Sequence, residues 1–151
     1  MTSTSDRQIF PPEVIAEFNA LGVDLAALFS AGALGDRIGV EIVHAEPRRV
    51  VGTMPVEGNT QPYGLLHGGA SAVLAETLGS IGAMLHGGPT RLAVGVDLNV
   101  THHRGARDGL VTGVATPLHL GRSTATYQIA IADDADRPVC TGRLTCLLRD
   151  A

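Results

Sequence analysis

Aromatic side chains and cysteine are both scarce in this sequence. Its 151 residues include no Trp, two Tyr and three Phe, so aliphatic side chains must fill the core. The only cysteines, Cys140 and Cys146, are too few for a disulfide framework, and their spacing fits neither a CxxC redox motif nor a zinc-ligand pair. We therefore expect two buried free thiols.

An excess of positive charge and long apolar runs are missing as well. The net charge of -4 provides no general attraction to nucleic acid or to an anionic membrane, so we expect neither as a partner. Residues 1–7 lack the apolar segment of a secretory signal, and no apolar run is long enough to predict a membrane span. Together with the free thiols, these absences predict a cytoplasmic protein.

What the sequence does contain is typical of a folded globular domain. Hydrophobic residues make up 44% of the chain and charged residues 17%, and 151 residues suffice to bury one core. The 19 glycines predict many tight turns between the elements of that domain.

The chain begins with a predicted helix over residues 12–28. Two prolines at positions 11 and 12 suit a first helical turn, and apolar residues recur every three or four positions. These apolar residues are Val14, Ile15, Phe18, Leu21 and Leu25. Gly32 and Gly35 then break the pattern, so we expect an amino-terminal extension over residues 1–33 and a main domain over residues 34–151.

Alternating apolar residues predict two strands before one long central helix and four strands after it. The predicted strands cover residues 38–42, 49–54, 94–100, 110–115, 127–131 and 140–148. Turns are predicted at the Glu46–Pro47 pair and at residues 57–64, 105–109, 121 and 133–136. This order predicts an α+β fold in which an antiparallel sheet surrounds the helix.

The central helix, residues 70–85, is apolar on nearly every face and carries a single charge, Glu76. A helix of this kind is buried rather than exposed. An unpaired carboxylate in a core is costly, or shifts its pKa until it is neutral, so proteins rarely keep one without a use. We expect Glu76 to be catalytic; the alternatives are an exposed edge position or an ion pair with an arginine. Ser80, one turn later on the same face, can orient a ligand or bond back to the helix.

Two glycines, Gly68 and Gly69, begin the central helix, where backbone N–H groups are unpaired and the helix dipole is positive. Without side chains they allow a substrate carbonyl to approach these donors, which makes the segment a candidate oxyanion hole. Gly68 and Glu76 are separated by about 12 Å along a helix. They cannot both contact one carbonyl from the same helix, so we expect the site to be shared by two subunits.

The run from Gln61 to Ser71, QPYGLLHGGAS, followed by Leu74-Ala75-Glu76, resembles the hotdog-fold thioesterases of the PaaI type. The similarity is greatest to the 1,4-dihydroxy-2-naphthoyl-CoA thioesterases of menaquinone biosynthesis. It continues through residues 94–99, 102–109, 117–121 and 142–145. The resemblance implies the hotdog fold, an antiparallel β-sheet wrapped around a long central α-helix, with an extra amino-terminal helix.

The resemblance also implies roles for individual residues. Glu76 would be the nucleophile or the general base at the thioester carbonyl, and the Gly68 N–H would polarise the carbonyl oxygen. Gln61 and His67 would position the thioester or the water, and Ser80 would stand near the acyl group. The residues that would line the coenzyme A groove are Gly95, His102, His103, Arg104, Gly105, His119, Leu120, Gly121, Arg122 and Ser123.

Three arginines, Arg104, Arg107 and Arg122, are the candidates to bind the phosphates of coenzyme A, and the alternative for each is an ordinary solvated side chain. No metal is expected, because the histidines lack an HExxH motif and adjacent strand residues face opposite ways. No cofactor is expected beyond the coenzyme A that forms part of the substrate.

The expected activity is hydrolysis of an aromatic acyl-CoA, such as 1,4-dihydroxy-2-naphthoyl-CoA, by a homodimer or homotetramer with active sites at the dimer interface. A medium-chain or phenylacetyl-type acyl-CoA is an alternative substrate. An enoyl-CoA hydratase is disfavoured because it would require an Asp–His pair, whereas a non-catalytic acyl-CoA binding module stays open. The sequence leaves undecided the acyl group and whether Glu76 acts as nucleophile or base.

Overall fold

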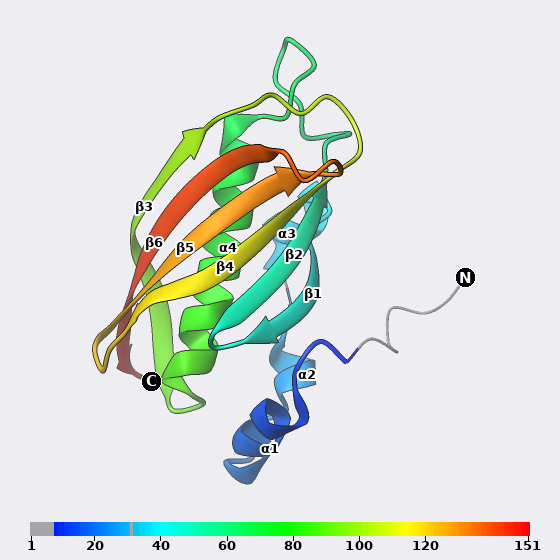
Figure 1. Ribbon diagram of the computed structural model, residues 1–151. Helices are drawn as coiled ribbons and strands as arrows, with labels where there is room; N and C mark the ends of the chain where they lie inside the picture. Colours follow the sequence, from blue (N-terminus) through cyan, green and yellow to red (C-terminus); the bar gives the residue numbers. More distant parts are fainter. Residues whose placement is uncertain (1–7, 31) are drawn as a thin grey trace.

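The computed structural model describes residues 8–30 and 32–151, and it consists of a curved sheet with one long helix behind it (Figure 1). Six antiparallel strands form the sheet in the order β1-β2-β4-β5-β6-β3. The elements are α1 (Pro12–Ala20), α2 (Leu25–Leu28), α3 (Gly32–Ile38), β1 (Glu41–Glu46), β2 (Arg49–Pro55), α4 (Gly68–Gly87), β3 (Arg91–His102), β4 (Leu110–Leu120), β5 (Thr124–Asp133) and β6 (Pro138–Asp150). The predicted α+β hotdog architecture is confirmed.

The strands follow the alternation in the sequence. Every second residue along most of β5 and β6 is buried, because one face of the sheet packs on α4 while the other meets solvent. The β5–β6 turn forms at the predicted aspartate-rich segment, where Asp136 adopts a φ of 57°. Strand β3 ends the sheet: it pairs with β6 on one side, and its other edge has no partner strand in the described part of the chain.

Helix α4 packs closely on the sheet because glycines stand where the two meet. A Cβ at Gly82 would lie 2.6 Å from the Tyr127 ring, and one at Gly79 would lie 2.7 Å from Leu144. The buried Tyr127 hydroxyl in turn donates a hydrogen bond of 2.6 Å to the Pro47 carbonyl in the β1–β2 turn. These contacts fix the depth of α4 and therefore the position of the side chains on its opposite face.

The amino-terminal prediction is wrong in part. The expected helix over residues 12–28 is divided into α1 and α2, because Gly22 turns the chain with a φ of 74° and Asp24 caps α2 by accepting the Ala27 N–H. The glycines at 32 and 35, expected to end helical structure, instead belong to α3. Gly39, with a φ of 74°, ends α3, so β1 begins later than the predicted position 38.

The amino-terminal helices share one core with the sheet. Phe10, Val14, Phe18 and Leu25 are buried in the same hydrophobic cluster as the residues beneath α4. The expected boundary between residues 33 and 34 falls inside α3, and the division into extension and main domain stays a prediction. The expected absence of a secretory signal concerns residues 1–7, which lie outside the described residues.

The apolar character of α4 has a structural explanation. By length (20 residues) and by a mean hydropathy of 1.2 this helix could cross a membrane, yet half of it is buried inside the fold. Its buried face is the one that packs on the sheet, as expected for the core helix of a globular domain. The two cysteines lie under the same helix in β6, and both are buried free thiols as predicted.

Candidate active site

The Glu76 carboxylate lies in an apolar groove on the side of α4 that the sheet leaves uncovered. The groove has a volume of about 340 Å³ and is walled by α3, α4 and β3. Its lining residues are Leu34, Gly35, Ala72, Val73, Glu76, Thr77 and Leu98. Glu76 is the only charged side chain among them, so the groove combines one carboxylate with walls suited to an apolar ligand.

The predicted burial of α4 on nearly every face is wrong for this face. Glu76 and its neighbours Ala72, Val73 and Ser80 are half-buried, because the sheet ends at β3 and does not close around the helix. Glu76 makes no ion pair or hydrogen bond with the described residues, so the predicted alternative of an arginine partner does not hold there. Desolvation nevertheless raises the pKa of its carboxyl above 4.5. A carboxylate in this state is a better proton acceptor than a solvated one.

Gly95 and Ser80 hold positions beside the carboxylate. A side chain at Gly95 would collide with the Glu76 carboxylate, so glycine in β3 is what leaves room for it. Gly95 is paired across the sheet with Cys146. Burial raises the pKa of the Cys146 thiol, a hydrogen bond with Ser80 lowers it, and the charge of Glu76 raises it again. Gly95, expected in the coenzyme A groove, therefore lies directly under Glu76.

The other predicted catalytic group is at the start of α4. His67 caps the helix: its Nδ1 accepts the Gly69 N–H at 2.8 Å, and its carbonyl accepts the Ala70 N–H at 2.9 Å. The Gly68 N–H, by contrast, donates to no acceptor among residues 8–30 and 32–151. Of the two glycines, Gly68 is thus the one that keeps an available donor, and His67 contributes by fixing the backbone around it.

A second cavity, also of about 340 Å³, surrounds Gly68. It is lined by Gln61, Leu65, Leu66, Gly68, Ser71, His102, His103, Arg104, Gly105 and Val139. The His102 ring lies against Gly68, because a Cβ at that position would be 2.7 Å from Nε2. The Gln61 side-chain oxygen accepts the Tyr63 N–H within a tight turn, and His103 Nε2 lies 2.9 Å from Thr141 Oγ1. The structure therefore gathers many of the predicted site residues here.

The Glu76 groove and the Gly68 cavity have no lining residue in common. Both are built on α4, and eight residues of helix separate the two groups by about 12 Å. A single chain therefore does not present Gly68 and Glu76 to one carbonyl carbon. The shared site stays a prediction, and it requires a second copy of the chain.

The predicted coenzyme A groove is divided between the two ends of α4. His102, His103, Arg104 and Gly105 adjoin Gly68 at the start of the helix. Residues 119–123 instead lie at the end of β4 and in the β4–β5 turn at the far end, where His86 Nε2 lies 2.8 Å from the Gly121 carbonyl. A helix of 20 residues is about 30 Å long, so these two groups do not form one continuous surface within a chain.

Sequence reasoning missed several residues that line these cavities. Ser71 is 1% exposed and lines the Gly68 cavity, whereas Leu34 of α3 lines the Glu76 groove. Neither has a signal of its own in the sequence, because a serine in an apolar helix and a leucine after a glycine are both common. Within the described residues, no three His, Cys, Asp or Glu side chains come together as a metal site.

The chain is similar in sequence to known thioesterases. Residues 63–140 match the family model described as the thioesterase superfamily. The chain is 44% identical over 117 residues to the proofreading thioesterase EntH of Cronobacter turicensis, covering 77% of this chain and 85% of that protein.

Two solved structures are also similar to this chain. A thioesterase of Haemophilus influenzae has a TM-score of 0.78 and 38% identity, covering 84% of this chain and 89% of that one. A mutant thioesterase of Pseudomonas aeruginosa has a TM-score of 0.75 and 35% identity, covering 89% and 94%.

Proposed function

The chain belongs to the thioesterase superfamily and is a thioester hydrolase, and we propose that it hydrolyses an aromatic acyl-CoA such as 1,4-dihydroxy-2-naphthoyl-CoA. The observation that carries the proposal is the groove at Glu76. It holds one unpaired carboxylate with a raised pKa between apolar walls, in a volume of about 340 Å³. That volume lies within the range of small-molecule sites and suits a compact apolar acyl group.

The proposed reaction needs a carboxylate and an oxyanion donor. As a general base, Glu76 takes a proton from water while the water oxygen attacks the thioester carbonyl carbon. The Gly68 N–H donates to the carbonyl oxygen as negative charge develops there. The tetrahedral intermediate then collapses, the C–S bond breaks, and the thiolate of coenzyme A takes up the proton that Glu76 held. As a nucleophile, Glu76 would attack the same carbon itself, and water would hydrolyse the resulting anhydride.

The proposed enzyme is a homodimer, or a dimer of dimers, in which Gly68 of one subunit meets Glu76 of the other. The edge of β3 supports this assembly, because an unpaired strand edge is a template for another strand. Leu92, Val94 and Val96 on this strand are 52%, 45% and 60% exposed. The uncovered face of α4 lies beside this strand, so antiparallel pairing of two β3 strands would bury both together.

Release of free thiol from a panel of thioesters tests the proposed activity. Aromatic acyl-CoA esters should give the highest kcat/KM, above the medium-chain and phenylacetyl esters. If medium-chain esters are hydrolysed faster, the substrate assignment is wrong although the chain remains a thioesterase. Single turnover in oxygen-18 water then separates the two roles of Glu76. A general base places solvent oxygen in the first acid released, whereas a nucleophile can deliver a carboxylate oxygen of its own.

Subunit complementation tests the shared site. Glu76→Gln should inactivate one half of each site, and Gly68→Val should obstruct the other half, displacing only the exposed His102 ring. After subunit exchange in an equal mixture, about a quarter of the wild-type activity should return, because half of the dimers hold one intact site. A mixture that remains inactive while size-exclusion chromatography shows mixed dimers would place Gly68 and Glu76 in separate functions.

A further inference from the structure

Asn59 is one of two polar or charged residues that are buried in the described part of the chain, the other being Ser71. It lies in the irregular segment between β2 and α4, where its neighbours Gly58 and Thr60 are both exposed. Gly58 adopts a φ of 81°, so the chain turns sharply just before Asn59. A buried amide costs free energy unless hydrogen bonds satisfy it, so its partners indicate what it holds in place.

The side-chain amide of Asn59 joins the end of α3 to the end of β2. Its Nδ2 donates hydrogen bonds of 2.7 Å to the Ile38 carbonyl and 2.8 Å to the Pro55 carbonyl. Both acceptors are carbonyl oxygens, so only the NH2 group of the amide can face them. Ile38 is the last residue of α3, where helix carbonyls lack partners within the helix. Asn59 therefore satisfies one of these carbonyls and anchors α3 to the sheet.

Helix α3, which this amide anchors, is a wall of the Glu76 groove. The helix has seven residues, and its Leu34 and Gly35 line the groove. In so short a helix, a displacement at Ile38 also moves Leu34, which lies about one turn earlier. The position of the groove wall therefore depends on the hydrogen bonds of the Asn59 amide.

The backbone carbonyl of Asn59 acts on the other half of the proposed site. It accepts the His67 N–H at 2.8 Å, and the His67 carbonyl accepts the Ala70 N–H at 2.9 Å, so both ends of His67 are held. The Gly68 nitrogen belongs to the same planar peptide group as the His67 carbonyl. The direction of the Gly68 N–H, the proposed oxyanion donor, therefore depends on where Asn59 holds His67.

The outer side of the same segment is held by the β3–β4 loop rather than by Asn59. The Val56 N–H donates to the Gly109 carbonyl at 3.0 Å, and the Leu66 N–H donates to the Ala106 carbonyl at 2.7 Å. These bonds fix the two ends of the segment. A change at Asn59 should therefore move the inner side of the segment without releasing the whole of it.

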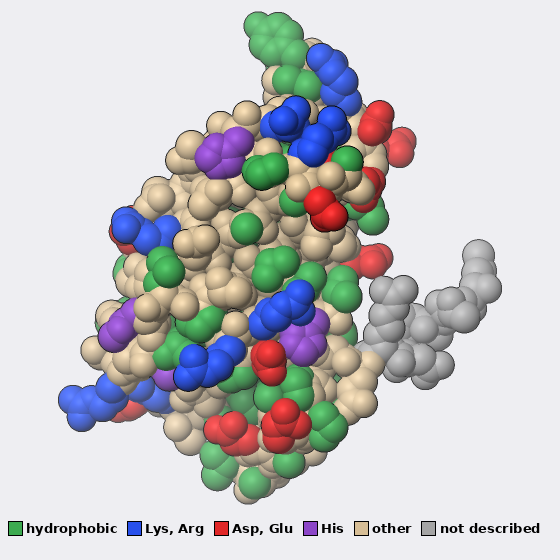
Figure 2. Space-filling view, in the orientation of Figure 1, with side chains coloured by type: hydrophobic (Ala, Val, Ile, Leu, Met, Phe, Trp, Pro, Cys, Tyr) green, Lys and Arg blue, Asp and Glu red, His purple; other side chains and the backbone are tan. Residues whose placement is uncertain are grey.

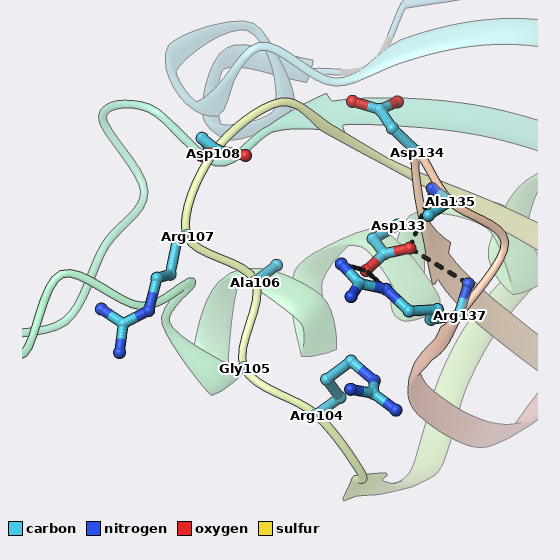
Figure 3. A pocket seen from close by; sticks show the side chains of 9 residues that line it. All are labelled: Arg104, Gly105, Ala106, Arg107, Asp108, Asp133, Asp134, Ala135 and Arg137. Carbon is cyan, nitrogen blue, oxygen red and sulfur yellow. Dashed lines mark hydrogen bonds and ion pairs between the residues drawn. The ribbon is translucent and has the colours of Figure 1, made fainter.

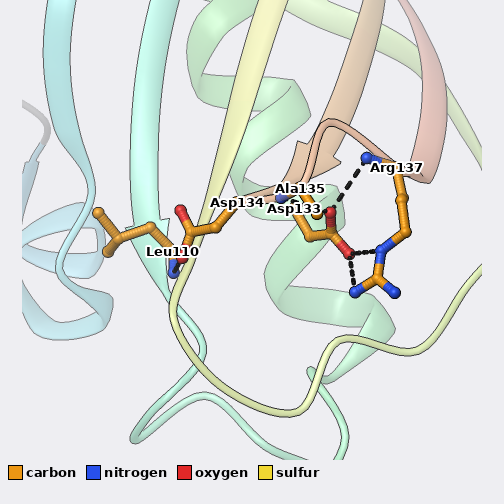
Figure 4. A network of polar contacts seen from close by, with 5 residues as sticks. All are labelled: Leu110, Asp133, Asp134, Ala135 and Arg137. Carbon is orange, nitrogen blue, oxygen red and sulfur yellow. Dashed lines mark hydrogen bonds and ion pairs between the residues drawn. The ribbon is translucent and has the colours of Figure 1, made fainter.

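The β3–β4 loop is in turn supported by the β5–β6 turn, at an end of the surface where basic and acidic side chains gather together (Figure 2). Three arginines and three aspartates line a cavity of about 480 Å³ there, so their charges balance (Figure 3). Asp134 Oδ2 accepts the Leu110 N–H at 2.9 Å, and Asp133 Oδ2 lies 2.8 Å from two nitrogens of Arg137 (Figure 4). These contacts support the loop against which the Asn59 segment rests.

We infer that Asn59 is a positioning residue for both halves of the proposed active site. Its amide places the α3 wall of the Glu76 groove, and its carbonyl places the Gly68 N–H. The inference rests on the proposed reaction, in which Glu76 and Gly68 act on one thioester. Asn59 lines neither the Glu76 groove nor the Gly68 cavity, so it acts only through α3 and His67.

Two thioesters separate the two effects of Asn59. A short acyl group does not reach Leu34, so kcat for a short acyl-CoA reports the placement of the Gly68 N–H. A bulky aromatic acyl group contacts the α3 wall as well. The ratio of kcat/KM for the bulky ester to kcat/KM for the short ester therefore reports the placement of that wall.

The experiment compares Asn59→Ala with the control Asn19→Ala, which alters an exposed asparagine of α1. For Asn59→Ala, kcat on the short ester should fall about tenfold or more, because a misplaced catalytic group can cost about a hundredfold in rate. The ratio of bulky to short ester should fall about threefold, because part of the apolar contact with α3 is lost. Both quantities should stay within twofold of the wild type in Asn19→Ala.

A double variant shows whether the change in the ratio passes through α3. Leu34→Ala already removes the contact between α3 and the acyl group, so adding Asn59→Ala should not lower the ratio further. The kcat on the short ester should still fall as it does in Asn59→Ala alone. Additive effects on the ratio would mean that Asn59 does not place the α3 wall.

A role in stability alone is recognised by expressing kcat per folded subunit. Circular dichroism gives the folded fraction, and size-exclusion chromatography gives the dimeric fraction. Asn59→Ser retains one hydroxyl donor and should show the same two effects at smaller size. If kcat and the ratio match the control while Tm falls, Asn59 only supports the fold and the positioning role is wrong. Failure of both Asn59 variants to fold would have the same meaning.

Failure of the proposed function is recognised separately, from Glu76→Gln and Gly68→Val. If both of these variants keep wild-type turnover, the proposed reaction fails and the role of Asn59 falls with it. If both are inactive and Asn59→Ala behaves like Asn19→Ala, the proposed reaction stands and the positioning role of Asn59 is wrong.

Discussion

The two ends of the site on α4 differ in what they offer a substrate. The Glu76 groove is apolar and contains one carboxylate, whereas the cavity at Gly68 is lined by backbone and side-chain donors, two histidines and Arg104. The first region supplies a proton acceptor and a surface for an apolar group. The second supplies hydrogen bonds for negative charge. Only the first region has a carboxylate and only the second has the available Gly68 N–H, so the proposed reaction needs both.

The largest loss of activity should come from removing the one carboxylate of the Glu76 groove. Glu76→Gln keeps the size of the side chain but abolishes its basicity, and kcat should fall by about a thousandfold, as for the loss of a general base. Thiol release and circular dichroism would check activity and fold in parallel. Turnover within tenfold of wild type would remove Glu76 from the mechanism.

The same variant should not lose stability. Because the folded-state pKa of Glu76 is raised above 4.5, the cost of ionising it is absent at lower pH and is fully present once the pH exceeds the raised value. Removing the carboxyl removes that cost, so Glu76→Gln should unfold at the same temperature as wild type or higher at pH 7. A clear decrease at pH 7 would show that Glu76 has a stabilising partner.

A second variant keeps the carboxylate but moves it. Gly95→Ala introduces a methyl group where the Glu76 carboxylate lies, and a displacement of this kind can lower kcat by about a hundredfold. Gly87→Ala is a matched control, because a Cβ there would have ordinary contacts of 3.5 Å with Arg91 and Leu148. If both alanine variants retain full kcat, Gly95 does not determine the position of Glu76.

The pH dependence of kcat/KM should report the ionisation of Glu76. The kcat/KM of the wild type should decline by about tenfold per pH unit below a pKa that lies above 4.5, because Glu76 must be ionised to act. The measurement is the rate on a good aromatic ester from pH 4 upward, with stability checked at each pH. If kcat/KM declines only at or below pH 4.5, the Glu76 carboxyl is solvated during turnover.

The smallest effect should come from the apolar wall. Leu34 is 56% exposed and lines the Glu76 groove, so Leu34→Ala enlarges the acyl site without opening the core. Loss of this contact should raise KM for a bulky aromatic ester about three- to tenfold, in proportion to the apolar area removed. The ratio of kcat/KM for bulky and short esters would measure it, and an unchanged ratio would exclude α3 from acyl recognition.

The fold was largely predictable because its elements carry strong periodic signals. The apolar stretch of α4 and the alternation in β5 and β6 were found from sequence within a few residues of their bounds. The region before β1 was not, because the helical pattern of residues 12–28 continues across Gly22 although the backbone turns there. The opposite error occurred at Gly32 and Gly35, which were predicted to end helical structure but lie within α3.

Candidate site residues could be proposed from the sequence, but their spatial arrangement could not. Glu76 and Gly68 were proposed from a lone charge and from an open helix start, and their catalytic roles stay predictions. The separation of residues 102–105 from residues 119–123 depends on which strands are neighbours, which a chain read in order does not reveal. The position of Gly95 under the Glu76 carboxylate was not predicted for the same reason, because it depends on the register of β3 against α4.

The unpaired edge of β3 has a consequence for the enzyme at low concentration. If strand pairing completes the proposed site, a dissociated subunit carries every chemical group and performs no catalysis. Specific activity would then decline on dilution below the dissociation constant of the dimer, and substrate would restore it by binding only the assembled form. The rate per subunit would thus depend on the enzyme concentration as well as on the substrate concentration.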